Sequence, residues 1–199
     1  MSYQNILFDL NAGIARLTLN RPERLNSFNP AMHAEVRAAL YRPLNQGVDM
    51  TDARQMERTT QRRAERAAAA LFERDRASQA LGMHLGGVRP GWARVIMRVR
   101  ADMVNGHGVC HGGIIFALGD SAFAFACNSH NESTVAAAAS IDFLTGAHEG
   151  DELTAEASEV WRTRRNGIYE ISICNQRGER IALFRGRSYR IDGQVVSEE

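Results

Sequence analysis

The most hydrophobic segment of the chain lies at residues 110–127, where "CHGGIIFALGDSAFAFAC" is apolar on nearly every side when wound as a helix. A helix that is apolar all round must be buried on most of its sides. The pattern therefore predicts a central helix enclosed by the rest of a domain. One carboxylate, Asp120, stands near its middle, although an ionised carboxylate away from water must be paired, hydrogen-bonded or used in chemistry.

Segments with the alternating pattern of β-strands lie on both sides of this helix. Residues 83–99 indicate two strands about a turn at Pro90-Gly91, and Asn166-Gly167 is a hairpin signal farther along. Four further strands are expected after the helix, at residues 133–145, 151–164, 167–175 and 180–191. This order predicts an α+β domain in which an antiparallel sheet wraps around the long central helix.

The beginning of the chain has a different character. Residues 1–40 show a short strand-turn-helix pattern, in which Asn29 is an N-cap followed by a proline. About 40 residues cannot easily bury a core of their own. A polar stretch follows, and an amphipathic helix is expected at 59–80. We therefore divide the chain into an N-terminal fragment (1–40), a linker (41–58) and the main domain (59–199).

Composition excludes several classes of function. A formal net charge of +1 creates no large field of either sign, so neither nucleic acid nor a membrane surface is expected as a partner. The three cysteines, Cys110, Cys127 and Cys174, are odd in number and widely spaced, which indicates free thiols in a reducing compartment better than a disulfide framework. No secretion signal or membrane span is recognisable, so we expect a cytoplasmic protein.

Two features of the central helix suggest a catalytic site. Gly112-Gly113 stands at the start of the helix, where backbone N–H groups are free and the helix dipole is positive, which describes an oxyanion hole. The alternative for this glycine pair is a plain turn. Asp120 is a candidate base or nucleophile. The alternative for Asp120 is a structural acid that accepts hydrogen bonds from Ser121 or from backbone amides.

Spacing adds a constraint on assembly. Eight residues separate Gly112 from Asp120, which is roughly 12 Å along a helix axis, so one chain cannot bring both to the same carbonyl group. Two such helices packed antiparallel about a twofold axis would place Gly112 of one chain opposite Asp120 of the other. A homodimer is therefore the minimal active unit in this hypothesis.

Other candidates are weaker. His107, Cys110 and His111 lie within one turn, and no downstream pair completes the four ligands of a zinc site, so no metal is expected. Cys110 and His111 as nucleophile and base are disfavoured, because neighbours in sequence rarely point at each other. Gly119, inside the helix, indicates the close approach of another backbone or of a ligand.

The runs at residues 105–131, 140–157 and 175–191 resemble the phenylacetate-pathway hotdog-fold acyl-CoA thioesterases of the PaaI type, and the resemblance covers about residues 61–193. It implies hydrolysis of phenylacetyl-CoA or hydroxylated aryl-acetyl-CoA to the free acid and CoA. No separate cofactor is implied, since CoA is part of the substrate. The implied assembly is a dimer with sites at its interface, usually within a tetramer.

The resemblance also implies roles for particular residues. Asp120 would be the catalytic carboxylate, and the Gly112 N–H would polarise the thioester carbonyl. Asn105 and His111 would line the site from the Gly112 side, while Ser121 would assist beside Asp120 from the other chain.

Residues 1–40 resemble something else, the N-terminal strand-turn-helix of crotonase-type enoyl-CoA hydratases and isomerases. The rest of the crotonase core is absent from the sequence, so this fragment is expected to be non-catalytic. Two alternatives to a thioesterase stay open, a non-catalytic acyl-CoA-binding hotdog module and a scaffold for a pathway complex. A binding module has no need of the carboxylate at Asp120.

Overall fold

The computed structural model describes residues 3–11, 14–22, 29–46 and 50–197 of the 199-residue chain. By its internal contacts the chain divides into two compact units, Met1–Met56 and Glu57–Glu199. No helix among the described residues is both long and apolar enough to cross a membrane.

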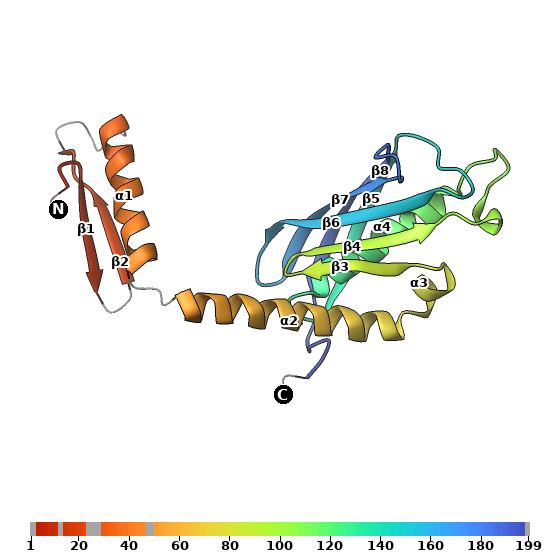
Figure 1. Ribbon diagram of the computed structural model, residues 1–199, viewed down its shortest axis with the longest axis horizontal. Helices are drawn as coiled ribbons and strands as arrows, with labels where there is room; N and C mark the ends of the chain where they lie inside the picture. The colour runs from red at the N-terminus through yellow and green to blue at the C-terminus, as the bar shows by residue number, and fades with distance from the viewer. Residues whose placement is uncertain (1–2, 12–13, 23–28, 47–49, 198–199) are drawn as a thin grey trace. The chain divides into compact units, whose positions relative to one another are not determined.

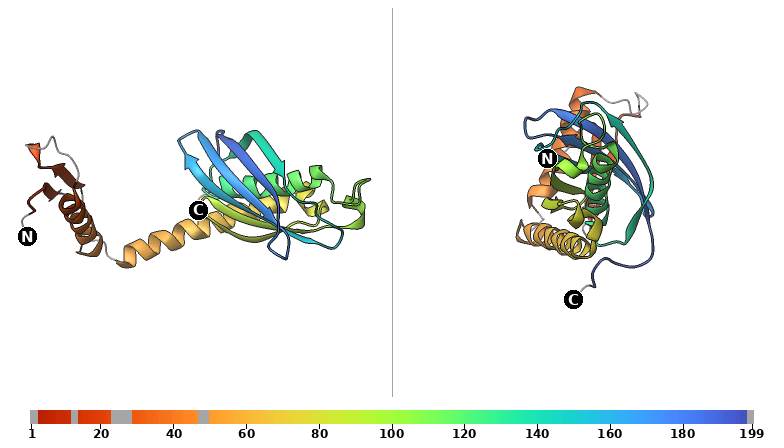
Figure 2. Two further views of the ribbon diagram at one scale, coloured as in Figure 1. Left: turned by 90° about the horizontal axis from the view of Figure 1, so that it is seen from above. Right: turned by 90° about the vertical axis from the view of Figure 1, so that its right-hand side faces the viewer.

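The larger unit is built on one six-stranded antiparallel sheet with the strand order β3-β4-β6-β7-β8-β5 (Figure 1). The strands are β3 (His84–Arg89), β4 (Trp92–Arg98), β5 (Thr134–Phe143), β6 (Glu152–Arg162), β7 (Asn166–Cys174) and β8 (Arg180–Arg190). The sheet curves around the helix α4 (Gly112–Asn128), as Figure 2 shows. The predicted sheet wrapped around a central helix is confirmed.

Packing explains the composition of α4. Leu118, Ala122 and Phe123 are completely buried and belong to one core cluster with the inward side chains of the sheet. The Phe123 ring lies 5.3 Å from the ring of Tyr169 and 6.2 Å from that of Phe184, between centroids. Each large apolar side chain buried in this way contributes about 1.5–3 kcal/mol, which offsets the ordering of the chain.

The strands show the alternation that a one-sided sheet requires. On β4, Ala93, Val95 and Met97 are fully buried, while the residues between them are partly exposed. The turn before β4 contains Gly91 with φ of +72°, which confirms the predicted Pro90-Gly91 turn.

At two positions, 167 and 119, the structure requires glycine for a reason other than the one that the sequence suggests. The hairpin between β6 and β7 turns at residues 163–166, since the Thr163 N–H donates to the Asn166 carbonyl at 2.7 Å. Gly167 lies inside β7, where a Cβ would be 2.7 Å from the Tyr169 ring. The hairpin is present, but this glycine supplies space instead of the turn. At Gly119, where the close approach of a backbone or a ligand is expected, the nearest group is the Phe184 ring, which a Cβ would approach to 3.0 Å.

The region before β3 contains two helices where one was expected. Helix α2 (Met50–Arg74) ends just before Asp75, and α3 (Arg76–Ala80) begins after it. The Asp75 carboxylate caps α3 by accepting from the Ser78 N–H at 3.0 Å. The expected linker, residues 41–58, contains the end of α1 (Pro30–Gln46) and the start of α2.

The smaller unit has a two-stranded antiparallel sheet, β1 (Ile6–Asn11) and β2 (Ile14–Leu19), with α1 packed on it. Among its described residues, Ile6, Met32 and Ala39 form a buried core cluster. The Asn29 side chain accepts from the Met32 N–H at 2.7 Å, which confirms the predicted N-cap.

Candidate active site

Asp120 lies midway along α4, half-buried, with no hydrogen-bond donor to its carboxylate among the residues that the structure describes. Burial raises the pKa of Asp120 above its ordinary value, and the negative charge of Asp75 raises it further. A structural carboxylate would be expected to have donors around it. An unpaired carboxylate of raised pKa is suited instead to accepting a proton or attacking a substrate.

The start of α4 offers a free donor. His111 is the N-cap, and its Nδ1 accepts from the Gly113 N–H at 3.0 Å. The Gly112 N–H, by contrast, has no acceptor in the described part of the chain. This N–H stands at the positive end of the helix dipole, where a developing oxyanion is favoured.

The ring of Phe143 lies over the start of α4. A Cβ added to Gly112 would be 3.0 Å from Cζ of Phe143, a distance at which one of the two groups must give way. Phe143 is itself half exposed, at 53%. Glycine at position 112 therefore leaves room for both the ring and a ligand atom that approaches the N–H.

The structure does not bring Gly112 and Asp120 together within one chain. Both belong to the same unbroken helix, so the separation of roughly 12 Å expected from the helical rise applies. Within a single chain, Gly112 and Asp120 therefore cannot act on the same carbonyl group.

Asn105 shapes the loop that leads into α4. Its Oδ1 accepts from the His107 N–H at 2.9 Å and from the Val109 N–H at 3.4 Å, and its backbone N–H donates to the Val109 carbonyl at 2.8 Å. An isolated bridge between Val104 and Cys110 closes the same loop. Asn105 thus fixes the approach to Gly112, and its side-chain NH2 group remains available to a ligand.

Ser121 has a partner that the sequence does not reveal. Its Oγ lies 2.7 Å from Oγ of Ser78, and the Ser78 hydroxyl donates to Oδ2 of Asp75 at 2.5 Å. The spacing of Asp75 and Ser78 is that of an N-cap, a signal present in the sequence but hidden inside the single helix expected there. The proximity of α3 to α4 had no sequence signal.

The remaining candidates near the loop do not assemble a second site. No group of three or more potential metal ligands occurs among the described residues. Burial raises the pKa of the Cys110 thiol to about 11, and Cys110 lies near the backbone carbonyl of His111, at 3.9 Å from Sγ. A buried neutral thiol is a poor nucleophile.

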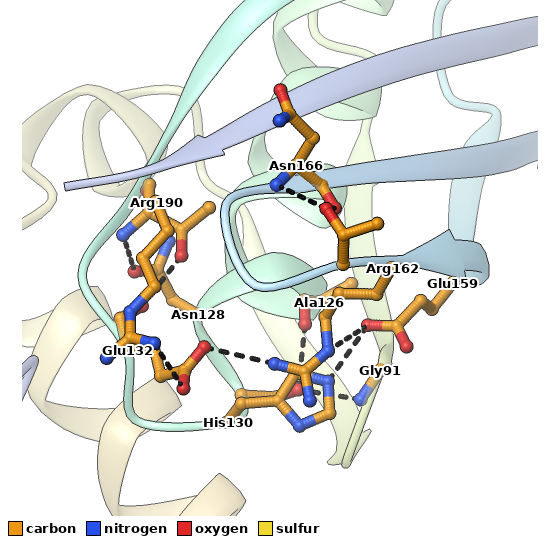
Figure 3. Close-up of polar contacts among 12 residues, drawn as sticks. Gly91, Ala126, Asn128, His130, Glu132, Glu159, Arg162, Asn166 and Arg190 are labelled. Atoms are coloured by element: carbon orange, nitrogen blue, oxygen red, sulfur yellow. Dashed lines mark hydrogen bonds and ion pairs between the residues drawn. The ribbon is translucent and has the colours of Figure 1, made fainter.

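A polar cluster occupies the opposite end of α4 (Figure 3). His130 Nε2 lies 2.9 Å from Glu159, and the Glu132 carboxylate accepts from Arg162 and from Arg190, each at 3.0 Å. These polar groups are paired with one another. They join the segment after α4 to β6 and β8, which is a structural role.

An antiparallel sheet wrapped around a single buried helix, with a carboxylate midway along that helix, is the architecture of the hotdog-fold thioesterases. The family described as "Thioesterase superfamily" matches residues 107–182. The chain is 46% identical over 131 residues to the acyl-coenzyme A thioesterase PaaI of Escherichia coli K12, covering 66% of this chain and 94% of that protein. The solved structure of the E. coli PaaI protein has a TM-score of 0.67 at 45% identity, covering 67% of this chain and 97% of that one. The chain therefore belongs to the PaaI-type hotdog thioesterases and is an acyl-CoA thioester hydrolase.

A second, short likeness concerns a different family. The chain is 57% identical over 35 residues to the 1,2-epoxyphenylacetyl-CoA isomerase of E. coli K12, covering 18% of this chain and only 13% of the isomerase. This match supports the resemblance of the N-terminal fragment to crotonase-type enzymes, and its short extent assigns no activity to the fragment.

Proposed function

We propose that this protein hydrolyses phenylacetyl-CoA, or a ring-hydroxylated relative, to the free acid and CoA at a site shared by two chains. The observation that supports the site most directly is that α4 carries both the Asp120 carboxylate and the Gly112 N–H, neither of which has a hydrogen-bond partner among the described residues. The aryl substrate is supported by the two likenesses, since the E. coli PaaI structure is described as from the phenylacetic acid degradation operon and the matched isomerase acts on an epoxyphenylacetyl-CoA.

The chemistry follows from these two groups. In one route, Asp120 takes a proton from water as the water oxygen attacks the thioester carbonyl carbon; in the other, the carboxylate attacks and water then cleaves the mixed anhydride. In both, negative charge builds on the carbonyl oxygen and is stabilised by the Gly112 N–H and the helix dipole. In the first route the tetrahedral intermediate expels the CoA thiolate, which takes the proton back from Asp120. In the second route the intermediate expels the thiolate to leave the anhydride, and water then hydrolyses the anhydride to the free acid, which regenerates the Asp120 carboxylate and supplies the proton to the thiolate. Neither route uses a metal or a further cofactor.

The exposed edge of the sheet supports the shared site. β5 pairs with β8 on one side and with no described strand on the other, and its residues from Val135 to Ser140 are exposed and mostly alanine. An exposed, small-residue edge strand is a template for pairing with another chain. We propose that β5 pairs with its copy in a dimer, which sets the two α4 helices antiparallel. Two such dimers would form the tetramer that the family resemblance implies.

The neighbouring residues take supporting roles in this proposal. His111 orders the first turn of α4 through Gly113, and its exposed ring lines the approach to Gly112. Asn105 holds the preceding loop and offers its NH2 group to the substrate. Ser121 acts beside Asp120, on the side of the site that comes from the other chain.

A thiol-release assay tests the proposal, with phenylacetyl-CoA, hydroxyphenylacetyl-CoA and straight-chain acyl-CoAs as substrates. We expect the highest kcat/KM for the aryl-acetyl thioesters. Asp120→Asn is expected to lower kcat by about 100-fold or more, as for loss of a general base or nucleophile. Full activity of Asp120→Asn would refute the catalytic assignment.

A comparison of Gly112→Pro with Gly112→Ala separates the effect of losing the N–H from the effect of filling the space beside it. Proline is tolerated at the first position of a helix and removes the N–H, while alanine adds a Cβ near Phe143 and keeps the N–H. We expect Gly112→Pro to be slower than Gly112→Ala by about 100- to 1,000-fold, the effect of losing one oxyanion donor. Equal rates for the two variants would remove the N–H from the mechanism.

The same experiments distinguish the alternative of an acyl-CoA-binding module. Such a module would bind acyl-CoA in calorimetry and release no thiol from any member of the panel. A hydrolase releases thiol, and its Asp120→Asn variant still binds the intact thioester.

A further inference from the structure

Three polar side chains form a hydrogen-bonded series that ends next to Asp120 in sequence. Asp75 accepts from the Ser78 hydroxyl at 2.5 Å and from the Ser78 N–H at 3.0 Å, and Ser78 lies 2.7 Å from Ser121 between their hydroxyl oxygens. Ser78 is only 2% exposed, so water does not substitute for either partner. The series joins the start of α3 to the middle of α4.

The direction of these hydrogen bonds is fixed by chemistry. An ionised carboxylate can only accept, and a serine hydroxyl has one hydrogen. Because Ser78 gives its hydrogen to Asp75, Ser121 must give its own hydrogen to Ser78. The lone pairs of the Ser121 oxygen are then the part of this hydroxyl that is left for a further contact, so toward any other group Ser121 can act only as an acceptor.

Of the groups at the reacting centre, the thioester oxygen and sulfur have no hydrogen to donate, whereas the attacking water has two. We infer that Asp75 and Ser78 are positioning residues which hold the Ser121 hydroxyl as a hydrogen-bond acceptor for the attacking water, beside Asp120. This inference rests on the proposed function. It makes Ser121 a group that orients the water and not a donor to the thioester.

Asp75 has a second effect on the same site, through its charge. Together with burial, the Asp75 charge raises the pKa of Asp120. Among the described residues, the charge of Asp120 also acts on Cys127 of α4, whose thiol is kept neutral because burial raises its pKa to about 12. Among the charged groups of the described chain, Asp75 is therefore the one whose charge raises the pKa of Asp120.

Asp75→Asn tests the hydrogen-bonded series with little change to the fold, because asparagine caps a helix as well as aspartate does. The new NH2 group would donate to Ser78, which would then donate to Ser121, so the series would run in reverse and the Ser121 hydrogen would face the water. We expect kcat to fall about tenfold with little change in KM, as for a misplaced reactant. We also expect the acid limb of the kcat/KM profile to shift to lower pH, since the loss of the Asp75 charge lowers the pKa of Asp120.

Ser78→Ala separates the hydrogen bonds from the charge. It interrupts the series and leaves the Asp75 carboxylate in place, so we expect a lower kcat with an unchanged acid limb. In a Ser121→Ala background, Asp75→Asn should cause no further loss of kcat but should still shift the acid limb. Glu73→Gln, an exposed carboxylate two residues from Asp75, is the matched control and should alter neither quantity.

The outcomes are distinguishable from a failure of the proposed function. If the wild type releases no thiol, or Asp120→Asn retains full activity, the proposed function itself fails. If both of those results are as expected, but Asp75→Asn and Ser78→Ala keep the wild-type kcat and pH profile, the positioning role is wrong. A fall in Tm without a change in kcat or in the acid limb would likewise refute it, by showing that the series only stabilises the α3–α4 contact.

Discussion

Replacing Asp120 by asparagine should stabilise the protein at neutral pH while it abolishes turnover. Asp120 is half-buried, lacks a hydrogen-bond donor in the described chain and faces the charge of Asp75, so its ionised form is disfavoured in the folded state. A fully buried unpaired charge is destabilising by several kcal/mol, and partial exposure to water reduces this. We expect a gain of about 1 kcal/mol, in the range typical of stabilising substitutions.

The raised pKa of Asp120 determines the pH range in which its charge lowers the stability of the folded protein. Because the pKa of Asp120 is raised on folding, the folded chain binds the proton more tightly than the unfolded chain does. Stability is therefore lost as the pH rises from the ordinary pKa of aspartate through the raised value, and the loss is complete above it. The difference between Asp120→Asn and the wild type should be largest at neutral pH and should shrink as the pH falls toward about 4.

Thermal unfolding measured across this pH range, at one protein concentration, is the assay. A gain of about 1 kcal/mol corresponds to a rise in Tm of about 2–4 °C for a domain of this size. Glu73→Gln serves as the control, because it removes an exposed carboxylate for which no such gain is expected. A Tm for Asp120→Asn equal to or below that of the wild type at neutral pH would show that Asp120 is a stabilising structural acid.

Three further predictions concern other parts of the domain. Gly186→Ala places a Cβ 2.8 Å from the buried ring of Phe123 and should destabilise the protein by about 1–3 kcal/mol, measured by chemical denaturation; an unchanged midpoint would mean that the ring has room to move. Burial raises the pKa of the Cys110 and Cys127 thiols to about 11 and about 12. Iodoacetamide at mildly alkaline pH should therefore label these two thiols only after unfolding, as followed by mass spectrometry. Rapid labelling of the native protein would contradict their burial. Treatment with EDTA should leave thiol release unchanged, and a loss that zinc restores would place a metal in the mechanism.

The fold was largely predictable from local patterns. The all-round apolar character of residues 110–127 and the alternation in the following strands are strong signals, because burial and side-chain periodicity act on each residue directly. The structure differs from the expectation for single residues where side-chain packing competes with local conformational preference. Gly167 looks like a turn glycine in sequence, but the Tyr169 ring beside it determines the residue. The break at Asp75 was hidden because both flanking segments favour helix.

The candidate site was predictable only in part. Asp120 and Gly112 are conspicuous because an acid in an apolar helix and a glycine pair at its start both need a reason. The contributions of Asp75 and Ser78 were not predictable, since they depend on the packing of α3 against α4, which leaves no periodic signal. The hydrogen bonds of Asn105 within its own loop likewise appear only once the loop closes.

Mixing two inactive variants tests whether one site combines Gly112 of one chain with Asp120 of another. Gly112→Pro fits the first helical position, since His111 before it already has φ of −61° and ψ of 130°, which a residue before proline prefers. In a mixed dimer of Gly112→Pro with Asp120→Asn, one site carries both substitutions and the other carries neither. After unfolding and refolding together in equal amounts, the mixture should regain about one quarter of the wild-type activity, because about half of the dimers are mixed and each has one intact site. Activity that stays at the level of the separate variants, in mixtures shown by mass spectrometry to contain the mixed dimer, would place both residues of each site in the same chain and refute the shared site.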